Sequence, residues 1–460
     1  MMAPKVDRPP DGFDLEVETL IIGAGACGLI AALSATEAGQ DVLVIEADAV
    51  PSGSTALSAG LIPAAGTKLQ QAAGIDDSPA RFAADIQAKA HGENEQALVD
   101  LLTQNAAPVI DFLMEVHGLV FSVVDDFDYP GHSRHRMHGL PTRSGAELIN
   151  ALRNAAELTG IDIVCNLRAE TLFFSDDLVH GIAARRPDGR METIGCKRLI
   201  LACNGFGGNR ALVAQHMPEI ESGLWFGHDG NRGDAVIWAD QIGAATQYLG
   251  AYQGHGNVAY PHGILITWAT ITEGGVQVNR MGKRFWNEAQ GYSEAARAVL
   301  AQPGGVAFTI FDARIADIAR QFEDFKRAEE QGAIKSAATP EGLADKLGLP
   351  ADALTETLSN IPAGGTDEFG RCFGASSLSP SYCGVRVTGG LFHTQGGLRV
   401  DKTARVLTRS GALIQNLFAG GGAACGVSGS RDRGYLSGNG LLAAVVLGRI
   451  AGSCKRLLYP

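Results

Sequence analysis

Three glycines near the start of the chain, and an acidic residue after them, have the spacing of a nucleotide-binding site. Gly23, Gly25 and Gly28 form a Gly-x-Gly-x-x-Gly pattern, and Glu46 follows it by about 20 residues. In this pattern the first glycine permits a tight turn, the second lets the backbone approach a pyrophosphate, and the third lets a helix pack on a strand. A carboxylate at the position of Glu46 binds ribose hydroxyls. The predicted chemistry is therefore the binding of a dinucleotide.

The flanking sequence indicates which elements position these residues. Apolar and β-branched residues predict a buried strand over 17–22, a helix over 29–38 that stops at Gly39, and a second strand over 42–45. In this order the N-terminal N–H groups of the helix and its positive dipole end are offered to the phosphates. Glycines that merely form a turn would leave Glu46 unexplained.

A loop of small hydroxyl residues follows Glu46. In the segment 51–60 small hydroxyl residues stand between two glycines, so its backbone and hydroxyl groups can wrap a flat or phosphorylated ligand. Ser54, Thr55, Ser58 and Gly60 are predicted to contact the cofactor, although an ordinary Ser/Gly loop has the same composition. Because the loop holds no His or Cys, a covalent bond to the cofactor is not expected there.

Basic side chains gather in the segment 129–139. Such a cluster can hold a carboxylate or carbonyl oxygen of a substrate, and Arg134, Arg136 and His138 are the candidates for that contact. An ordinary solvated loop is an equal interpretation. The sequence alone leaves both open.

Composition restricts the classes of protein. The chain has 460 residues, 45% hydrophobic and 19% charged, which suits two domains with a large core. A net charge of −12 disfavours a nucleic acid or an anionic membrane as a partner. The apolar stretch 436–454 carries glycines and Arg449, and is predicted to be a core helix, not a membrane span. Eight scattered cysteines and the absence of a recognisable secretory signal favour the cytoplasm.

Further strands are predicted in the middle and near the end of the chain. A meander is expected over 161–166, 171–174, 180–185 and 198–201. Its last strand leads into the small-residue turn 202–208, and a short strand over 384–387 precedes a glycine-rich segment. A buried strand that ends in such a turn is typical of two-dinucleotide flavoproteins, where the chain returns over the cofactor.

From these motifs the chain resembles the FAD-binding family of fumarate reductase and succinate dehydrogenase flavoproteins, which includes 3-ketosteroid Δ1-dehydrogenases and related ketone desaturases. Four blocks carry the resemblance, and together they cover nearly all of the chain after residue 14: Gly23–Glu46, Gly53–Gly60, Gly282–Glu288 and Pro380–Ile450. The resemblance implies an α/β, Rossmann-like FAD-binding domain over 14–250 and 376–460. It also implies an inserted α+β capping domain over 251–375, and FAD held without a covalent bond.

The resemblance extends the set of expected cofactor contacts. The final helix is expected to begin near Ser437 or Asn439, either of which could cap it, with its N–H groups toward the flavin. Such a dipole end stabilises the anion that reduced flavin becomes, which favours FAD over NAD. The further cofactor-binding residues expected are Ala169, Asn204, Gly205, Gly421, Ser437, Asn439 and Leu441.

The resemblance also suggests catalytic residues. Fumarate-reducing relatives carry a proton-donating arginine eight residues after the arginine of the R-F-x-N-E block, and here that position is Tyr292. A tyrosine there resembles the ketone desaturases, in which a phenol accepts the α-proton while flavin N5 takes a hydride from the β-carbon. Tyr382 matches the tyrosine that polarises the ketone in these desaturases. His393 matches a substrate-binding histidine of fumarate reductases, and a catalytic role is also expected for it. His255 and Arg431 are expected to bind substrate, although the segment around Arg431 departs from the family pattern.

Three functions are compatible with the sequence. The first is an FAD-dependent desaturase of a ketone (a cyclic ketone, an oxocyclohexane carboxylate or a 3-ketosteroid) that passes electrons to an acceptor. The second is reduction of an activated alkene in a fumarate-like unsaturated acid. The third is a flavin subunit that transfers electrons to a partner, although the chain lacks the cysteine spacing of a haem or iron–sulfur relay.

Overall fold

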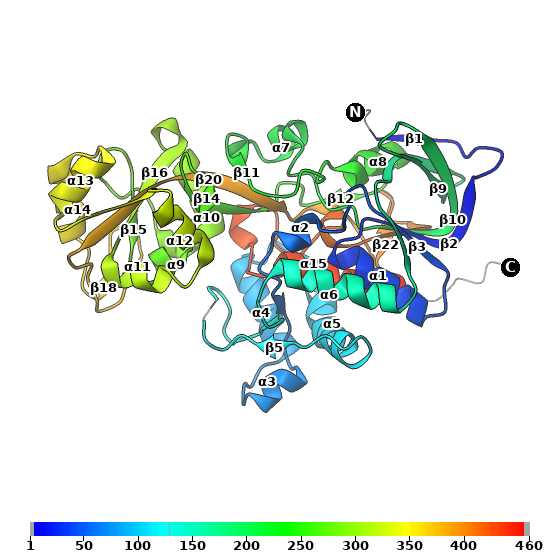
Figure 1. Cartoon of the computed structure of the whole chain (residues 1–460), viewed down its shortest axis with the longest axis horizontal. Helices are drawn as coiled ribbons and strands as arrows, with labels where there is room; N and C mark the ends of the chain where they lie inside the picture. Colours follow the sequence, from blue (N-terminus) through cyan, green and yellow to red (C-terminus); the bar gives the residue numbers. More distant parts are fainter. Residues whose placement is uncertain (1–3, 128, 455–460) are drawn as a thin grey trace. The chain divides into compact units, whose positions relative to one another are not determined.

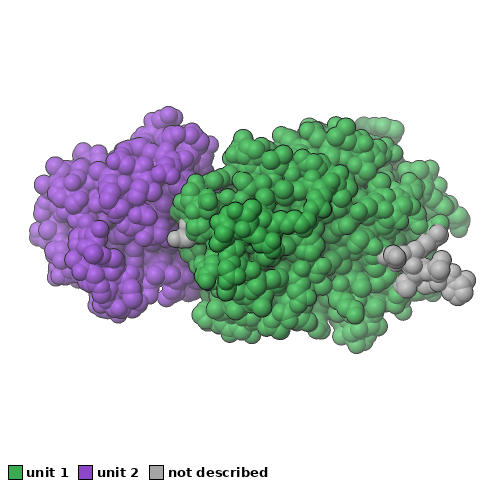
Figure 2. Space-filling view, turned by 90° about the horizontal axis from the view of Figure 1, so that it is seen from below, with its two compact units in different colours: residues 1–216, 227–252, 393–460 green, residues 217–226, 253–392 purple. Residues whose placement is uncertain are grey.

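The computed structural model describes residues 4–127 and 129–454, which form two compact units (Figure 2). Unit 1 comprises residues 1–216, 227–252 and 393–460, and unit 2 comprises residues 217–226 and 253–392. The second unit therefore ends at Phe392 and includes the short segment 217–226, whereas the sequence predicted an insertion over 251–375.

A mixed sheet forms the centre of unit 1. Its strand order is β1-β8-β9-β10-β2-β3-β7, and β23 pairs with β10 and β22. The strands are β1 (Lys5–Asp7), β2 (Leu15–Ile22), β3 (Val42–Ile45), β7 (Asp162–Val164), β8 (Arg168–Ser175), β9 (Leu178–Arg185), β10 (Met191–Leu201), β22 (Arg405–Leu407) and β23 (Leu413–Ala419). β8, β9 and β10 form the predicted antiparallel meander. β7 does not belong to it, because it pairs in parallel with β3.

The parallel part of this sheet brings distant segments of the chain to one edge. β23, β10, β2, β3 and β7 lie side by side and parallel. Their carboxyl ends therefore point the same way, and ligands of open α/β sheets bind at that edge. The hydrogen bonds of the sheet continue one residue beyond the ends of β2 and β10. Gly23 N donates to Ile45 O at 2.8 Å, and Ala202 N donates to Ile22 O at 2.9 Å.

Helices and short strands complete unit 1 (Figure 1). The helices are α1 (Ala26–Glu37), α2 (Gly53–Ala56), α3 (Lys68–Ala72), α4 (Pro79–Lys89), α5 (Gln96–Glu115), α6 (Gly145–Leu158), α7 (Arg210–His216), α8 (Asp234–Ile242) and α15 (Asn439–Ser453). The short strands are β4 (Ile62–Pro63), β5 (Ser122–Val123), β6 (Met137–Gly139), β12 (Thr246–Gln247) and β21 (Gly397–Leu398). α1 and α15 pack closely, because a Cβ at Gly448 would lie 2.5 Å from the carbonyl oxygen of Cys27.

Among the described residues, α5 is the one helix long and apolar enough to cross a membrane by length and composition. Half of its most apolar window is buried inside the protein. α15, predicted from the sequence to be a core helix, is shorter and largely buried.

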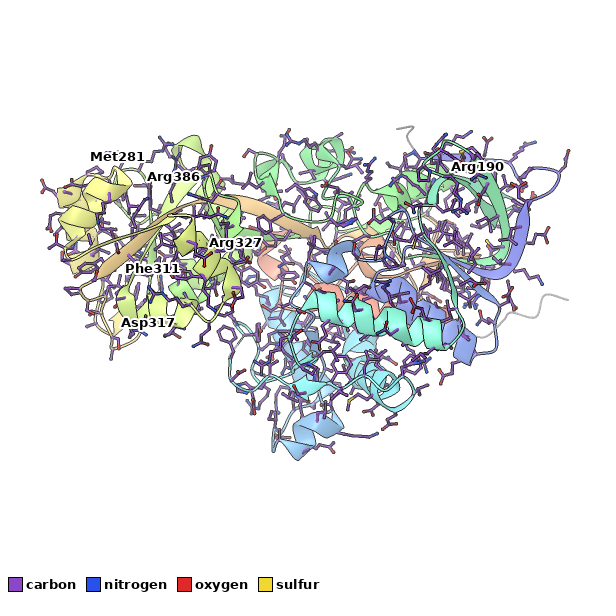
Figure 3. The ribbon with its side chains drawn as sticks, in the orientation of Figure 1. Arg190, Met281, Phe311, Asp317, Arg327 and Arg386 are labelled. Carbon is purple, nitrogen blue, oxygen red and sulfur yellow. The ribbon has the colours of Figure 1, made fainter. Side chains whose placement is uncertain are left out.

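Unit 2 is built on a second sheet with the strand order β14-β13-β20-β16-β15, in which β11 and β17 also pair with β20. The strands are β11 (Leu224–Trp225), β13 (Tyr252–Ala259), β14 (Ile264–Leu265), β15 (Val276–Val278), β16 (Val306–Asp312), β17 (Ile334–Ala337) and β20 (Tyr382–Thr394), with a separate pair β18 (Gly365–Thr366) and β19 (Cys372–Phe373). The helices are α9 (Ala269–Thr272), α10 (Tyr292–Leu300), α11 (Ala313–Ala319), α12 (Glu323–Glu330), α13 (Pro340–Leu347) and α14 (Ala351–Ser359). Phe311 of β16 is fully buried in the core of this unit (Figure 3).

β20 is much longer than the sequence predicted. The short strand expected over 384–387 is a continuous strand of 13 residues from Tyr382 to Thr394. Gly389 and Gly390 look like a chain break in the sequence, but Gly390 pairs with Leu224 of β11 and the ladder continues through it. This length decides where the residues at its two ends lie.

Candidate functional site

The three glycines of the opening motif have the geometry that their spacing predicts. Gly23 has φ +104°, and a Cβ at Gly28 would lie 1.8 Å from the carbonyl oxygen of Gly23, so neither position accepts a side chain. At Gly25 a Cβ would meet nothing nearer than the Thr55 hydroxyl oxygen, at 3.4 Å. Packing within the protein therefore does not require glycine at 25. Open backbone at the start of α1, with no side-chain cap, suits a phosphate.

Glu46 lies beside this loop at the end of β3. Its Oε2 accepts a hydrogen bond from Ala24 N at 2.8 Å, and its Oε1 accepts one from Asp48 N at 3.0 Å. The next strand approaches the same point, because Leu167 N donates to Glu46 O at 2.9 Å and Ala169 follows in β8. The carboxylate is thus fixed by backbone groups and keeps lone pairs for a ribose.

The Ser/Gly loop is joined to α1 and to the turn after β10. The Thr55 hydroxyl accepts from Ala26 N at 3.0 Å, and the Ser58 hydroxyl accepts from Gly60 N at 3.0 Å. Ser54 Oγ accepts from Asn204 Nδ2 at 2.8 Å. Asn204 adopts φ +64°, which turns the chain sharply after β10. These hydroxyl groups therefore fix the shape of the loop around the glycine motif.

The turn after β23 completes the edge of the sheet. Gly421, with φ +57°, lies where β23 ends, and Gly420 N donates to Leu201 O at 3.1 Å. A Cβ at Gly205 would lie 1.8 Å from the Thr394 hydroxyl oxygen, which explains glycine there. The candidate residues after β2, β3, β10 and β23 thus share one edge.

α15 begins differently from the expectation. Its N-cap is Gly438, with φ +86° and no side-chain cap, so neither Ser437 nor Asn439 caps the helix. Asn439 is its first residue, and Leu441, in the first turn, is half-buried. The buried phenol of Tyr435 accepts hydrogen bonds from the backbone N–H groups of Gly438 and Gly440, while burial raises the pKa of Tyr435 to about 12. This phenol stays protonated at neutral pH.

His393, at the end of β20, belongs to a chain of side-chain hydrogen bonds in unit 1. Its Nε2 lies 3.1 Å from Asn204 Oδ1, and its Nδ1 lies 2.8 Å from Gln395 Nε2. The chain continues through Ser428, whose hydroxyl donates to Gln395 Oε1 at 3.0 Å, and ends at Asn439 Nδ2, 3.1 Å from Ser428 Oγ. Both ring nitrogens are therefore engaged within the protein.

In unit 2, aromatic side chains surround His255. Its ring stacks on Tyr292 with centroids 5.0 Å apart and an interplanar angle of 18°, and meets Trp268 edge-on at 5.7 Å and Phe392 at 5.6 Å. Burial lowers the pKa of His255 to about 3, so this imidazole is neutral at physiological pH. We call these four residues the aromatic cluster.

A buried ion network holds the start of α10, and hence Tyr292. Glu288 is completely buried; its Oε2 binds Arg371 Nη1 at 3.0 Å and its Oε1 binds Arg284 Nε at 3.0 Å. Arg284 also pairs with Asp367. Gln277 N donates to Glu288 Oε1 at 2.9 Å, which ties the network to β15. Both arginines are thus neutralised by carboxylates of the protein.

Tyr382 does not lie with the other candidate residues. It begins β20, and at about 3.3 Å per residue it is roughly 33 Å from Phe392 at the other end. Its ring packs on the cluster around Leu343 and Leu354. The structure therefore does not bring Tyr382 together with the aromatic cluster, because the continuous strand β20 separates them.

The basic segment 129–139 is structural. Arg136 is buried, and its guanidinium binds Asp77 at 3.0 Å and Asp85 at 2.6 Å. His138 is also buried; its Nε2 lies 2.8 Å from Thr67 Oγ1 and its Nδ1 lies 2.9 Å from Arg136 O. Arg134 is exposed and donates to the Asp76 carbonyl oxygen at 3.1 Å. The interpretation that Arg136 and His138 bind substrate is corrected, because their polar groups are used to fold this segment. The contact of Arg134 with a substrate stays a prediction.

Arg431 is exposed on the segment before α15, and the structure does not bring it into the hydrogen-bonded chain of His393. Its neighbour Arg433 pairs with Glu93, which also binds the Ser430 hydroxyl. This segment is therefore held by Glu93 instead of offering two arginines to a ligand.

Sequence reasoning missed Gln395, Ser428, Trp268 and Tyr435. Gln395 had a signal, because residues two apart on an extended chain point to the same side and His393 was already a candidate. Tyr435 lies four residues before Asn439, the first residue of a helix whose start was recognised. Ser428 and Trp268 gave no local signal, because their contacts depend on how separate segments meet.

Comparisons with known proteins agree with this geometry. The family described as FAD binding domain matches residues 18–441. A probable fumarate reductase of Shewanella frigidimarina is 32% identical over 447 residues, which is 95% of this chain and 74% of that protein. A 3-oxosteroid 1-dehydrogenase of Mycobacterium tuberculosis is 29% identical over 334 residues, 62% of this chain and 58% of that protein.

Among solved structures, the open conformation of a flavocytochrome c3 fumarate reductase matches with a TM-score of 0.82 and 31% identity. The match covers 96% of this chain and 78% of that one. The glycine motif and the fixed Glu46 carboxylate fit FAD, because they offer backbone N–H groups to its phosphates and lone pairs to its ribose. The start of α15 adds a positive helix end.

Proposed function

Because the chain belongs to the family with an FAD binding domain, whose members here include fumarate reductases and a 3-oxosteroid dehydrogenase, we propose that this FAD-dependent oxidoreductase introduces a C=C bond next to a ketone. Its substrate is a cyclic ketone, an oxocyclohexane carboxylate or a 3-ketosteroid, and an acceptor reoxidises the flavin. Unit 1 holds the FAD without a covalent bond, and the aromatic cluster lies in unit 2. The expected extents of the two domains, 14–250 with 376–460 and 251–375, are part of this proposal.

The aromatic cluster is the observation that carries the proposal. By its spacing from Arg284, Tyr292 is expected to stand where fumarate-reducing relatives have an arginine. Its neighbours are His255, Trp268 and Phe392. A guanidinium suits the charged carboxylates of a dicarboxylate, whereas aromatic faces suit an apolar ring with a carbonyl. Arg284 and Arg371 are engaged by Glu288 and therefore do not replace that arginine.

Each residue has a definite task in this reaction. Bound FAD supplies a two-electron acceptor for the hydride of the β-carbon. Tyr292, as the phenolate, accepts the proton of the α-carbon and becomes the neutral phenol. His255, with a pKa of about 3, is too weak a base for that proton and instead holds the Tyr292 ring by stacking.

Tyr435 takes the task that the sequence had suggested for Tyr382. Because its phenol stays protonated and its oxygen already accepts two backbone N–H groups, the O–H is suited to donate a hydrogen bond to a carbonyl that gains negative charge. A phenol with a raised pKa is a donor and not a base. Tyr292 and Tyr435 therefore divide the roles of base and carbonyl donor.

A second candidate is the reduction of a fumarate-like acid. The 32% identity to a probable fumarate reductase supports it. The tyrosine at position 292 argues against it, because a phenol does not pair with a carboxylate as a guanidinium does.

Two experiments test the proposal. The first is anaerobic reduction of the bound flavin by candidate ketones, and the second is steady-state turnover of the same ketones with a dye acceptor. We expect cyclic ketones to bleach the flavin absorbance, and fumarate to reoxidise viologen-reduced enzyme only slowly. Fast fumarate turnover together with no bleaching by any ketone would overturn the proposal.

Three Tyr→Phe variants separate the roles. Tyr292→Phe and Tyr435→Phe should each lower kcat by about 10²-fold or more, because each removes a proton acceptor or an oxyanion donor. Tyr382→Phe is the matched comparison at the remote end of β20 and should keep full activity. If Tyr382→Phe were the inactive variant, the assignments would be reversed.

A further inference from the structure

The hydrogen bonds around His393 have a direction that can be worked out from one end. Gly205 N is a donor that cannot reverse, and it donates to Asn204 Oδ1 at 2.8 Å. This fixes the Asn204 amide with its oxygen toward His393. His393 Nε2, 3.1 Å from the same oxygen, must therefore carry a hydrogen and donate it.

The other ring nitrogen then depends on Gln395. The Gln395 amide nitrogen lies 2.8 Å from His393 Nδ1 and donates a hydrogen bond to it. Because Nδ1 accepts this bond, it carries no hydrogen, and the imidazole is neutral. Reversing the amide would place Oε1 there, and Nδ1 would then need a second ring proton. That arrangement is a buried imidazolium, which the surroundings disfavour because burial lowers the pKa of His393 to about 4.

Ser428 and Asn439 set the orientation of Gln395. The Ser428 hydroxyl accepts from Asn439 Nδ2 at 3.1 Å and therefore uses its own hydrogen on Gln395 Oε1 at 3.0 Å. Asn439 is buried, and its Oδ1 has no hydrogen-bond partner among the described residues. A donor from a ligand at the start of α15 would satisfy this oxygen and lock the whole chain in this direction.

We propose that Gln395 and Ser428 are positioning residues that hold His393 as a neutral imidazole with its proton on Nε2. His393 then orients groups by hydrogen bonding and is not a proton donor or acceptor of the reaction. This corrects the catalytic role that the sequence suggested for His393. The consequence for catalysis rests on the proposed function, whereas the protonation state of His393 does not.

The groups that the described residues of unit 1 present to this ring are uncharged. They are the Asn204 amide from the turn after β10, the Gln395 amide from the end of β20, and the Gly440 backbone of α15, whose Cβ would lie 3.8 Å from the ring. No carboxylate is among them to stabilise an imidazolium. A carboxylate introduced at Gln395 would supply that missing charge.

The test is nitrogen NMR of the FAD-loaded enzyme with ¹⁵N-labelled histidine, where His393→Asn identifies the His393 signals. In the wild type we expect the His393 ring to stay neutral, with its proton on Nε2, while the pH is taken through the ordinary histidine pKa of about 6.5. Gln395→Glu should raise the His393 pKa by about 1 to 3 units, so that an imidazolium appears in mildly acidic solution where the wild-type ring stays neutral. Ser428→Ala should shift the Nδ1 signal toward that of an unbonded nitrogen.

Gln71→Glu makes the same chemical change on the exposed surface of α3 and should leave the His393 signals unchanged. A wild-type His393 that titrates near the ordinary value, or carries its proton on Nδ1, would overturn the proposal. The pH dependence of the rate of flavin reduction gives a second readout. In Gln395→Glu this rate should change with pH where His393 titrates, a change that the wild type lacks. An enzyme that reduces no ketone would refute the proposed function but leave the NMR result to decide this inference.

Discussion

Cys27 lies between Gly25 and Gly28 at the start of α1, beside the nucleotide-binding edge. Its thiol is buried, and burial raises its pKa to about 12, so it holds almost no thiolate at neutral pH. Cys372 is the one exposed cysteine among the described residues. We expect a maleimide reagent to modify Cys372 in the folded protein and to leave Cys27 untouched. Mass spectrometry of the labelled peptides measures this, and equal labelling of the two would contradict the packing of α1.

Glu288 is the residue on which the position of Tyr292 depends. Glu288→Gln removes a fully buried charge between Arg284 and Arg371, which takes away the carboxylate that pairs with Arg371 and leaves Arg284 paired with Asp367. We expect the free energy of unfolding to fall by about 3–5 kcal/mol, measured by urea denaturation. Glu273→Gln breaks an exposed pair with Arg314 and should cost less than about 1 kcal/mol. Similar losses for both variants would show that the network does not hold α10.

At the scale of elements, the contact of α1 with α15 depends on glycine. Gly448→Ala would by itself favour the helix by about 1 kcal/mol, because alanine has the higher helix propensity. Its Cβ would however lie 2.5 Å from the carbonyl oxygen of Cys27, so we expect a net loss of about 1–3 kcal/mol and weaker FAD binding. Gly374→Ala adds a Cβ in open space and should change stability by less than about 0.5 kcal/mol. Thermal unfolding and FAD fluorescence measure both effects.

Elements with a strong local pattern could be predicted from the sequence, and elements set by distant pairing could not. The β2–α1–β3 unit and the glycine motif follow from apolar runs and fixed spacings over about 30 residues. The length of β20 was underestimated, because its glycine pair, Gly389 and Gly390, is held in the strand by β11, which is distant in the sequence. Tyr382 was expected in the candidate site from its resemblance to a family tyrosine, and the resemblance did not indicate how far the strand carries it from Phe392.

At the scale of the whole molecule, the cofactor edge was predictable and the polar contacts were not. Carboxyl ends of parallel strands meet by topology, so the sequence alone suffices to group Glu46, Asn204 and Gly421. The basic segment 129–139 could not be assigned, because the carboxylates that neutralise Arg136 come from Asp77 and Asp85, more than forty residues away. Charge in a sequence indicates a ligand only when the protein does not neutralise it.

Buried neutral histidines in both units make the stability of the whole molecule depend on pH. Burial lowers the pKa of His138 in unit 1 to about 4 and of His255 in unit 2 to about 3. In the unfolded chain both return to about 6.5. Between these values the unfolded state binds more protons than the folded state, so lowering the pH favours unfolding. Above the unfolded pKa neither group contributes to this dependence.

We therefore expect the free energy of unfolding to fall as the pH drops below about 6.5, with each such histidine adding about 1.4 kcal/mol per pH unit. Urea denaturation at a series of pH values measures this slope. Carboxylates with lowered pKa values, such as Asp85 and Asp367, lose their contribution only at lower pH, which separates the two effects. His138→Gln should reduce the slope by the contribution of one histidine. His262→Gln, at an exposed position, should leave the slope unchanged. An unchanged slope in His138→Gln would mean that His138 already binds a proton in the folded protein.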